Sequence, residues 1–327
     1  MKKKPSKFYR KSDKVIGILL LIVLLLIGYI VFFTPNPVGE NITAALPSSV
    51  QNAASKIGAL GEDSSVPLTT VEGTMEVDVL DVGQGSSTLF IADGYTVLID
   101  AGDTDRGYQI ADYLKSRGIN SIDLFIATHP HADHIGGMDE LMEEIDLKQI
   151  LMPEIPRSII PTTRAYLDVL EMIDQQGKVI IPAQSGDVYD VGPMHLEILA
   201  PSIAYNDLNN LSIATKVSHG SRSVLVTGDA EAESEKQMLL LHKSDLASDI
   251  YVVGHHGSRT STTKDFLKNI HPEYAVISCG LDNDYGHPHD VTINKLNDLG
   301  IPYYRTDLQG RITFYVSDAE ITVECEK

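Results

Sequence analysis

Cysteine is scarce in this sequence. The 327 residues contain only two, Cys279 and Cys325, and neither has the neighbouring ligands of a zinc finger. Both fall in segments with a strand-like pattern, so they could pair in an oxidising compartment or remain as two buried thiols. A zinc finger is excluded, whereas the state of the two thiols stays open.

Basic residues are also scarce outside the first 14 positions. Seven of the 26 Lys and Arg lie in residues 1–14, and the rest of the chain has 19 against 44 Asp and Glu, a formal charge of −25. Such a surface repels polyanions at long range, so a nucleic-acid substrate would need local basic groups or bound metal ions. The charge balance therefore excludes a module that coats DNA.

Only one apolar run is long enough to cross a membrane. Residues 15–33 contain no charge, and nineteen helical residues at about 1.5 Å each span the apolar core of a bilayer. Lys and Arg precede this run and are absent from residues 34–55, which predicts a cytoplasmic N-terminus and an extracellular remainder. A cleaved signal peptide is the alternative, but the run exceeds the usual length and no small-x-small site follows it.

The chain therefore divides into a short N-terminal part and one long folded part. Residues 34–72 are rich in Pro, Ser, Ala and Asn and have little periodicity, as expected of an extended tether. We predict a basic cytoplasmic arm (1–14), a single-pass anchor in the cell membrane (15–33), a flexible linker (34–72) and a folded domain (73–327).

Strand and helix patterns alternate through the folded domain. The predicted strands are residues 75–82, 87–92, 95–100, 122–128, 149–152, 179–181, 195–199, 212–217, 223–227, 250–253, 274–278, 303–305, 311–316 and 320–323. The predicted helices are residues 107–116, 138–144, 164–175, 231–241, 262–269 and 291–299. Strands with interspersed helices in both halves predict an α/β domain of two face-to-face sheets with helices outside.

The densest group of chemical side chains is the sequence Thr-His-Pro-His-Ala-Asp-His-Ile-Gly-Gly at residues 128–137. Imidazole and carboxylate are the ligands that borderline divalent ions prefer. In extended backbone His129 and His131 project to one side and can share an ion. Asp133 and His134 follow where the chain turns and can reach a second ion.

Two later strand ends supply further ligands. Asp229 follows the strand 223–227 and is placed to bridge two ions, although it could instead cap the helix 231–241. The strand 250–253 ends in Gly-His-His-Gly-Ser. We favour His255 as the ligand and His256 as an orienting or substrate-contacting group, with the reverse assignment open.

Two loops have the composition of substrate-contacting segments. Gly83 and Gly85 flank Gln84 in a turn, where missing β-carbons allow either a close approach to the site or simply a tight turn. His287 precedes Pro288 in a loop, and its imidazole can hold a phosphate oxygen or protonate a leaving group.

These segments resemble, in order and spacing, the metallo-β-lactamase superfamily of hydrolases, and within it the hydrolase domain of the ComEC type of bacterial competence proteins. The supporting stretches are residues 81–85, 98–102, 128–137, 209–212, 227–231, 254–258 and 285–289. The resemblance implies a four-layer αββα sandwich with the metals at one edge.

The resemblance also implies a role for each matching residue. His129 and His131 would hold the first ion, Asp133, His134 and His255 the second, and Asp229 both, with Asp100 in support. Many members have a further histidine on the first ion where this chain reads Asn209-Asn210-Leu211-Ser212. We therefore predict two divalent ions, Zn or Mn, with the first site the weaker.

The predicted activity is metal-dependent hydrolysis, in which two ions lower the pKa of a shared water and present it as hydroxide. Asp133 and His287 are the predicted catalytic residues, and the predicted substrate contacts are Gln84, His256, Ser258 and His287. The resemblance favours a phosphodiester such as extracellular DNA. Lactone, thioester or β-lactam hydrolysis is the alternative, as is a non-catalytic scaffold for DNA uptake or the envelope. The sequence indicates no protein partner.

Overall fold

The computed structural model describes residues 73–327. The predicted basic arm, anchor and linker lie outside the described residues. Among the helices of residues 73–327, none combines the length and apolar character that a membrane crossing requires.

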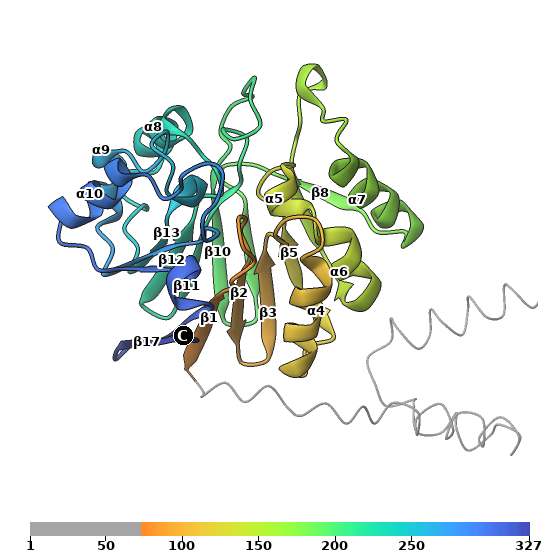
Figure 1. Ribbon diagram of the computed structural model, residues 1–327, viewed down its shortest axis with the longest axis horizontal. Coiled ribbons are helices and arrows are strands. Elements are labelled where there is room, and N and C mark those ends of the chain that lie inside the picture. Colours follow the sequence, from red (N-terminus) through yellow and green to blue (C-terminus); the bar gives the residue numbers. More distant parts are fainter. Residues whose placement is uncertain (1–72) are drawn as a thin grey trace, which may run out of the picture. The chain divides into compact units, whose positions relative to one another are not determined.

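The first sheet has eight strands in the order β17-β16-β1-β2-β3-β5-β7-β8 (Figure 1). Its strands are β1 (Thr74–Val79), β2 (Thr88–Ala92), β3 (Tyr95–Ile99), β5 (Leu124–Ile126), β7 (Ile150–Pro153), β8 (Ile180–Ala183), β16 (Ile312–Ser317) and β17 (Ile321–Cys325). Strands β3, β5, β7 and β8 run parallel to one another. Their carboxyl ends therefore lie along one edge of the sheet.

The second sheet has seven strands in the order β15-β14-β13-β12-β11-β10-β9. They are β9 (Val188–Val191), β10 (Met194–Ala200), β11 (Ala214–His219), β12 (Arg222–Val226), β13 (Ile250–Val252), β14 (Tyr274–Ile277) and β15 (Tyr303–Arg305). Strands β12 to β15 are parallel, so this sheet also gathers several carboxyl ends at one edge.

Helices cover the outer face of each sheet, which gives the four layers seen in Figure 1. The first sheet is covered by α4 (Gly107–Ser116), α6 (Met138–Glu144) and α7 (Arg164–Gln175). The second is covered by α8 (Ala232–Leu241), α9 (Lys264–Ile270) and α10 (Asp290–Asp298). The αββα sandwich predicted from the sequence is confirmed.

The alternating direction of side chains along the strands explains why the sheets are covered on both faces. In β1, Met75, Val77 and Val79 point into the apolar core between the sheets. In β2, Leu89 and Ile91 point the other way and pack under the helices of the first sheet. Because a strand has a period of two, a strand with apolar residues at every position serves both cores.

One predicted strand is divided between two sheets, and another, residues 75–82, already ends at Val79. Residues 122–128 were expected to form a single strand, but β4 (Ser121–Ile122) pairs with β6 (Asp146–Leu147) in a separate two-stranded sheet, and only β5 joins the main sheet. The break falls at Asp123, whose carboxylate accepts a hydrogen bond from the backbone N–H of Thr96 at 2.9 Å. The N–H of Asp123 in turn donates to the Thr96 carbonyl at 3.2 Å, so Asp123 stays bonded to β3 while Ser121 and Ile122 pair with β6.

Candidate metal centre

Three histidines gather directly after β5. His129 is fully buried at the strand end, and its Nε2 lies 2.9 Å from Nδ1 of His131. The chain then turns into the short helix α5 (Ala132–Ile135), which places the buried ring of His134 4.2 Å from that of His129, centroid to centroid. The structure therefore brings the predicted cluster together at the edge of the first sheet.

Asp100, at the end of β3, fixes the orientation of this cluster. Its Oδ1 accepts the backbone N–H of Thr128 at 2.8 Å, and its Oδ2 lies 2.9 Å from the Thr128 hydroxyl and 2.7 Å from Nδ1 of His134. Asp100 has a φ of 65°, in the left-handed region that Asp tolerates better than most residues. With Nδ1 held in this way, Nε2 of His134 points toward Asp229.

Asp229, after β12, joins the two halves of the centre. Its Oδ1 lies 3.1 Å from Nε2 of His134 and 3.6 Å from Nε2 of His256. Its Oδ2 lies 3.7 Å from Nε2 of His129 and 3.5 Å from Nε2 of His255. The backbone N–H of Asp229 donates to the Ser212 hydroxyl at 3.0 Å, which holds the residue in this position.

His255 and His256 occupy a short 3-10 turn, η2 (Gly254–Gly257), with φ values of 53° and 54°. Nδ1 of His256 lies 2.9 Å from the Ser278 carbonyl, so its Nε2 faces inward, 3.2 Å from Nε2 of His134 and 3.2 Å from Oδ2 of Asp133. His255 instead turns its Nδ1 to the Thr260 hydroxyl at 3.2 Å.

Two groups of donor atoms therefore lie close enough to hold ions. One group is Asp133, His134, Asp229 and His256, and the other is His129, His131 and Asp229. The structure places His256 in the first of these groups, whereas His255, the favoured ligand from the sequence, lies outside it. The reverse assignment that the sequence left open is the one that this geometry favours.

The charges of the cluster balance one another. Burial alone would raise the pKa of Asp229, but the imidazoles of His134 and His256 outweigh it and hold that pKa well below its ordinary value. Burial alone would lower the pKa of His134, but Asp229 and Asp100 raise it well above its ordinary value. Buried carboxylates that face a ring nitrogen in this way stabilise positive charge at the centre.

The donor set fits a divalent cation. Oδ1 of Asp229 is buried without a hydrogen bond, and two imidazole nitrogens, of His134 and His256, face each other at 3.2 Å beside it. Lone pairs that converge in this way repel one another unless a proton or a cation lies between them. Imidazole and carboxylate are the ligands of Zn²⁺ and, with water, of Mn²⁺.

A cavity of about 360 Å³ opens beside the cluster, and polar side chains dominate its lining. It is lined by Gln84, Asp103, His131, Ala132, Asp133, Asn209, Asp229, His255, His256, Tyr285 and His287. Two buried nitrogens of this lining, Nε2 of Gln84 and Nδ1 of His287, have no hydrogen-bond partner. Two of the predicted substrate contacts thus line the cavity and also have a nitrogen without a partner.

Glycines bring the Gln84 loop against the cluster. A β-carbon on Gly85 would lie 2.6 Å from the carbonyl oxygen of Asp133, and one on Gly280 would lie 2.7 Å from the backbone nitrogen of Gln84. Oε1 of Gln84 accepts the N–H of Gly280 at 3.1 Å, which leaves its Nε2 free. The close approach, rather than a tight turn alone, explains these glycines.

His287 is held between two rings. It stacks on His256 with an interplanar angle of 27° and on Tyr285 with one of 19°. Asn283 accepts the N–H of His287 at 2.9 Å and donates to its carbonyl at 2.6 Å. Burial and the imidazoles of His256 and His255 lower the pKa of His287 to about 4, so its ring is neutral at pH 7.

One predicted substrate contact does not line the cavity. Ser258 is 4% exposed, and its hydroxyl lies 3.0 Å from that of Thr260 inside the loop. Ser258 follows the left-handed turn at His255 and His256, and its carbonyl accepts a hydrogen bond from the Thr292 hydroxyl at 3.0 Å, so it supports the loop.

Sequence reasoning missed three kinds of residue. Asp103 and Tyr285 line the cavity, Asn283 positions His287, and Thr128 and Ser212 hold Asp100 and Asp229. Their only sequence signal is their place within or beside the matching stretches, because single hydroxyl and amide residues are common in loops.

The fold and the centre agree with the comparison to known families. The family model of the metallo-beta-lactamase superfamily matches residues 80–281. The chain belongs to this superfamily. It is a metallo-hydrolase whose His and Asp cluster fits a divalent metal site.

Two bacterial proteins are similar to this metallo-hydrolase over about three quarters of its length. It is 30% identical over 268 residues to ComE operon protein 3 of Bacillus subtilis and 30% identical over 250 residues to competence protein ComA of Neisseria gonorrhoeae. Each alignment covers 76% of this chain and about a third of the relative, 34% and 33%. The chain thus spans only about a third of the length of these competence proteins.

Solved structures confirm the fold alone. The metallo-beta-lactamase fold protein YhfI from Bacillus subtilis is 14% identical, with a TM-score of 0.51 over 75% of this chain and all of YhfI. CmlA, a diiron beta-hydroxylase from Streptomyces venezuelae, gives 0.51 over 76% of this chain and 55% of CmlA, at 14% identity.

Proposed function

We propose that this metallo-hydrolase is a phosphodiesterase that cleaves DNA outside the cell. One observation carries the choice of substrate: Gln84 and His287 line one polar cavity beside the metal ligands, and each has a side-chain nitrogen without a hydrogen-bond partner, Nε2 of Gln84 and Nδ1 of His287. A phosphodiester has two non-bridging oxygens to accept such hydrogen bonds, whereas a lactone, thioester or β-lactam has one carbonyl oxygen.

The proposed ligands follow from the geometry. His129, His131 and Asp229 would hold one ion, and Asp133, His134, Asp229 and His256 the other. A divalent ion bound there would lower the pKa of a water and stabilise charge on the phosphate oxygens. Three protein ligands in the first group against four in the second support the prediction that the first site is the weaker, and Zn and Mn both suit the donors.

The protein's own groups have separate roles in this proposal. Asp133, whose side chain is 25% exposed at the cavity, is placed to orient or deprotonate the attacking water. His134 and His256 hold its pKa well below the ordinary value despite burial, so it is a carboxylate throughout the neutral range. Neutral His287 and Gln84 would donate hydrogen bonds to the phosphate.

The reaction is tested with purified full-length chain and added Mn²⁺ or Zn²⁺. We expect hydrolysis of bis(p-nitrophenyl) phosphate and of DNA, little hydrolysis of a lactone, and a loss of at least about a hundredfold in kcat for Asp133→Ala. Metal content near zero would contradict the proposal, as would a rate for Asp133→Ala equal to that of the parent. Faster hydrolysis of the lactone would favour the alternative substrate class.

The location is a separate part of the proposal. The uncharged run at residues 15–33 and the basic residues before it support a single-pass anchor with the hydrolase domain outside the cell. The similarity to competence proteins supports a role in DNA uptake. Protease added to intact cells should release the domain, and full protection would overturn this topology.

A further inference from the structure

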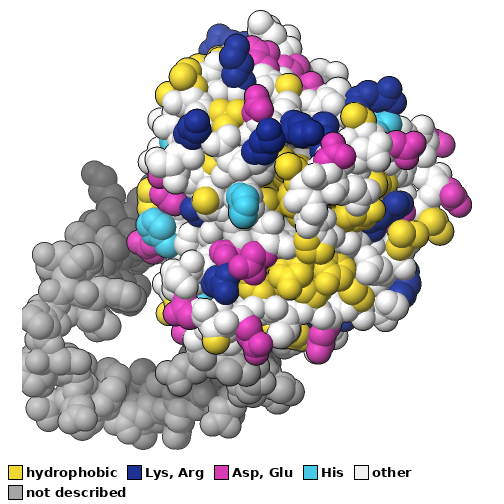
Figure 2. Space-filling model, turned by 90° about the vertical axis from the view of Figure 1, so that its left-hand side faces the viewer, with side chains coloured by type: hydrophobic (Ala, Val, Ile, Leu, Met, Phe, Trp, Pro, Cys, Tyr) yellow, Lys and Arg dark blue, Asp and Glu magenta, His cyan; other side chains and the backbone are white. Residues whose placement is uncertain are grey.

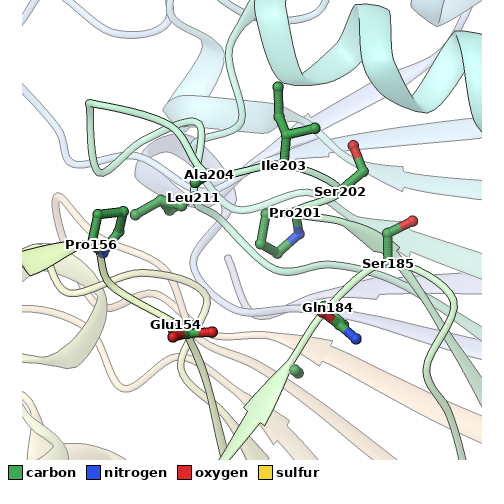
Figure 3. A pocket seen from close by; sticks show the side chains of 10 residues that line it. Glu154, Pro156, Gln184, Ser185, Pro201, Ser202, Ile203, Ala204 and Leu211 are labelled. Carbon is green, nitrogen blue, oxygen red and sulfur yellow. The ribbon is translucent and has the colours of Figure 1, made fainter.

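A second cavity lies beside the metal centre. It has a volume of about 400 Å³, within the range of small-molecule sites. It is lined by Glu154, Pro156, Ala183, Gln184, Ser185, Pro201, Ser202, Ile203, Ala204 and Leu211. Figure 3 shows Glu154 and Pro156 on one side, Gln184 and Ser185 opposite, and residues 201–204 with Leu211 above them.

Strand pairing places this cavity next to the metal ligands. Ile126 pairs with Leu151, and Pro153 pairs with Ala183. Glu154 and Gln184 directly follow β7 and β8, and β7 is the neighbour of β5, after which the segment with the metal ligands begins. Adjacent strands are about 4.8 Å apart, so the ends of β7 and β8 lie roughly 5 and 10 Å from the end of β5.

A single loop separates the two cavities. Asn209 lines the metal-side cavity, and Leu211, two residues later, lines the second one. The loop is anchored at both ends: the N–H of Ile213 donates to the Thr128 carbonyl at 2.9 Å, and the N–H of Ser185 donates to the Pro201 carbonyl at 2.9 Å. The second cavity therefore belongs to the edge of the sandwich that also carries the metal ligands.

The lining selects the kind of group that fits. It contains no Lys or Arg and has one carboxylate, Glu154, so it disfavours a phosphate. Pro156, Pro201, Ile203 and Leu211 offer apolar surface for a flat ring. The amide of Gln184 and the nearby serine hydroxyls offer both donors and acceptors, as the edge of a nucleobase requires.

We propose that this second cavity binds one unstacked nucleobase of the strand whose phosphate lies at the metal centre. The inference rests on the proposed phosphodiesterase function and adds a second position, the second cavity, at which the enzyme binds its substrate. Strand ends only about 5 to 10 Å apart place the bound base on a near neighbour of the scissile phosphate.

The test uses full-length chain and a set of labelled single-stranded oligonucleotides, each with one abasic site at a different position. For each oligonucleotide, kcat/KM is measured with Mn²⁺, so that the phosphate at the metal centre sets the register of the strand. We expect one position, within about three nucleotides of the cut, at which loss of the base lowers kcat/KM about tenfold, because the base loses its apolar and hydrogen-bond contacts in the cavity.

A matched pair of variants locates the effect. Ile203 lines the cavity and is 47% exposed, and Ile160 is 48% exposed and does not line it. Ile203→Asn should reduce the difference between intact and abasic oligonucleotides to less than about threefold, and Ile160→Asn should leave it near tenfold. The rate of each variant with bis(p-nitrophenyl) phosphate, which has no base, serves as its own reference, so that a general loss of activity is not taken for a loss of base recognition.

The outcomes distinguish a failure of this inference from a failure of the proposed phosphodiesterase function. If neither the small diester nor DNA is hydrolysed, the proposed function fails and the inference fails with it. If both are hydrolysed but every abasic position gives the same kcat/KM, the inference alone is overturned. Equal discrimination by Ile203→Asn and the parent would also overturn it.

Discussion

His255 and His256 share one backbone conformation but have different surroundings. Only His256 faces Asp133 and His134, whereas His255 contacts Thr260 and one oxygen of Asp229. His256→Ala should therefore reduce bound metal from about two ions per chain to about one, because the four-residue site loses a ligand. His255→Ala should keep both ions. Metal analysis after gel filtration measures this, and the reverse pattern would restore His255 as the ligand.

Asp100 is expected to act on metal affinity through His134. Asp100→Asn keeps the shape and the left-handed backbone but weakens the hydrogen bond that orients the imidazole, and loss of such support typically lowers metal affinity about 10- to 100-fold. Competition with a coloured chelator measures the change. Asp93→Asn is the matched control, since Asp93 also has a positive φ, of 48°, but lies exposed. Equal affinity in both variants would remove Asp100 from the centre.

The sequence showed which side chains gather, because ligand types are dense at residues 129–134 and follow strand ends. It left open which ring of the double histidine points inward. Side-chain direction is predictable where a strand alternates or a helix repeats, but two successive left-handed residues follow neither rule. The burial of Ser258 could not be predicted for the same reason.

The start of α9 depends on a side chain from α8. Glu235 is 1% exposed, and its carboxylate accepts the backbone N–H groups of Thr262 and, at 2.8 Å, Thr263. Glu235→Ala would leave both N–H groups without a partner and should lower the free energy of unfolding by about 2 to 4 kcal/mol. Urea denaturation measures this. Glu233→Ala, at an exposed position of α8, should change stability by less than about 0.5 kcal/mol, and equal effects would contradict the role of Glu235.

Long periodic segments were predictable and short ones were not. The helices 107–116, 138–144 and 164–175 have the predicted bounds, because each repeats its apolar residues over about two turns or more. The prediction lacked α5, α11 (Thr306–Gln309) and the 3-10 turn η1 (Arg157–Ile159), which are too short for a period to show. It also lacked β9, an edge strand with several exposed residues.

Charge over the whole molecule opposes the proposed substrate. Residues 15–327 carry a formal charge of −25. Figure 2 shows basic side chains gathered toward one end of the face beside α8, α9 and α10, with acidic ones interspersed. DNA must therefore approach against a net repulsion, which screening by salt reduces.

This repulsion predicts an unusual salt dependence. For a chain lacking residues 1–14, kcat/KM toward DNA should rise severalfold between about 10 and 150 mM NaCl, as the screening length falls from about 30 to 8 Å. Most DNA-binding proteins behave in the opposite way, because salt competes with their phosphate contacts. The small diester bis(p-nitrophenyl) phosphate carries one charge and should respond less. A steady fall in kcat/KM toward DNA would show instead that local basic groups, rather than the net charge, govern the encounter.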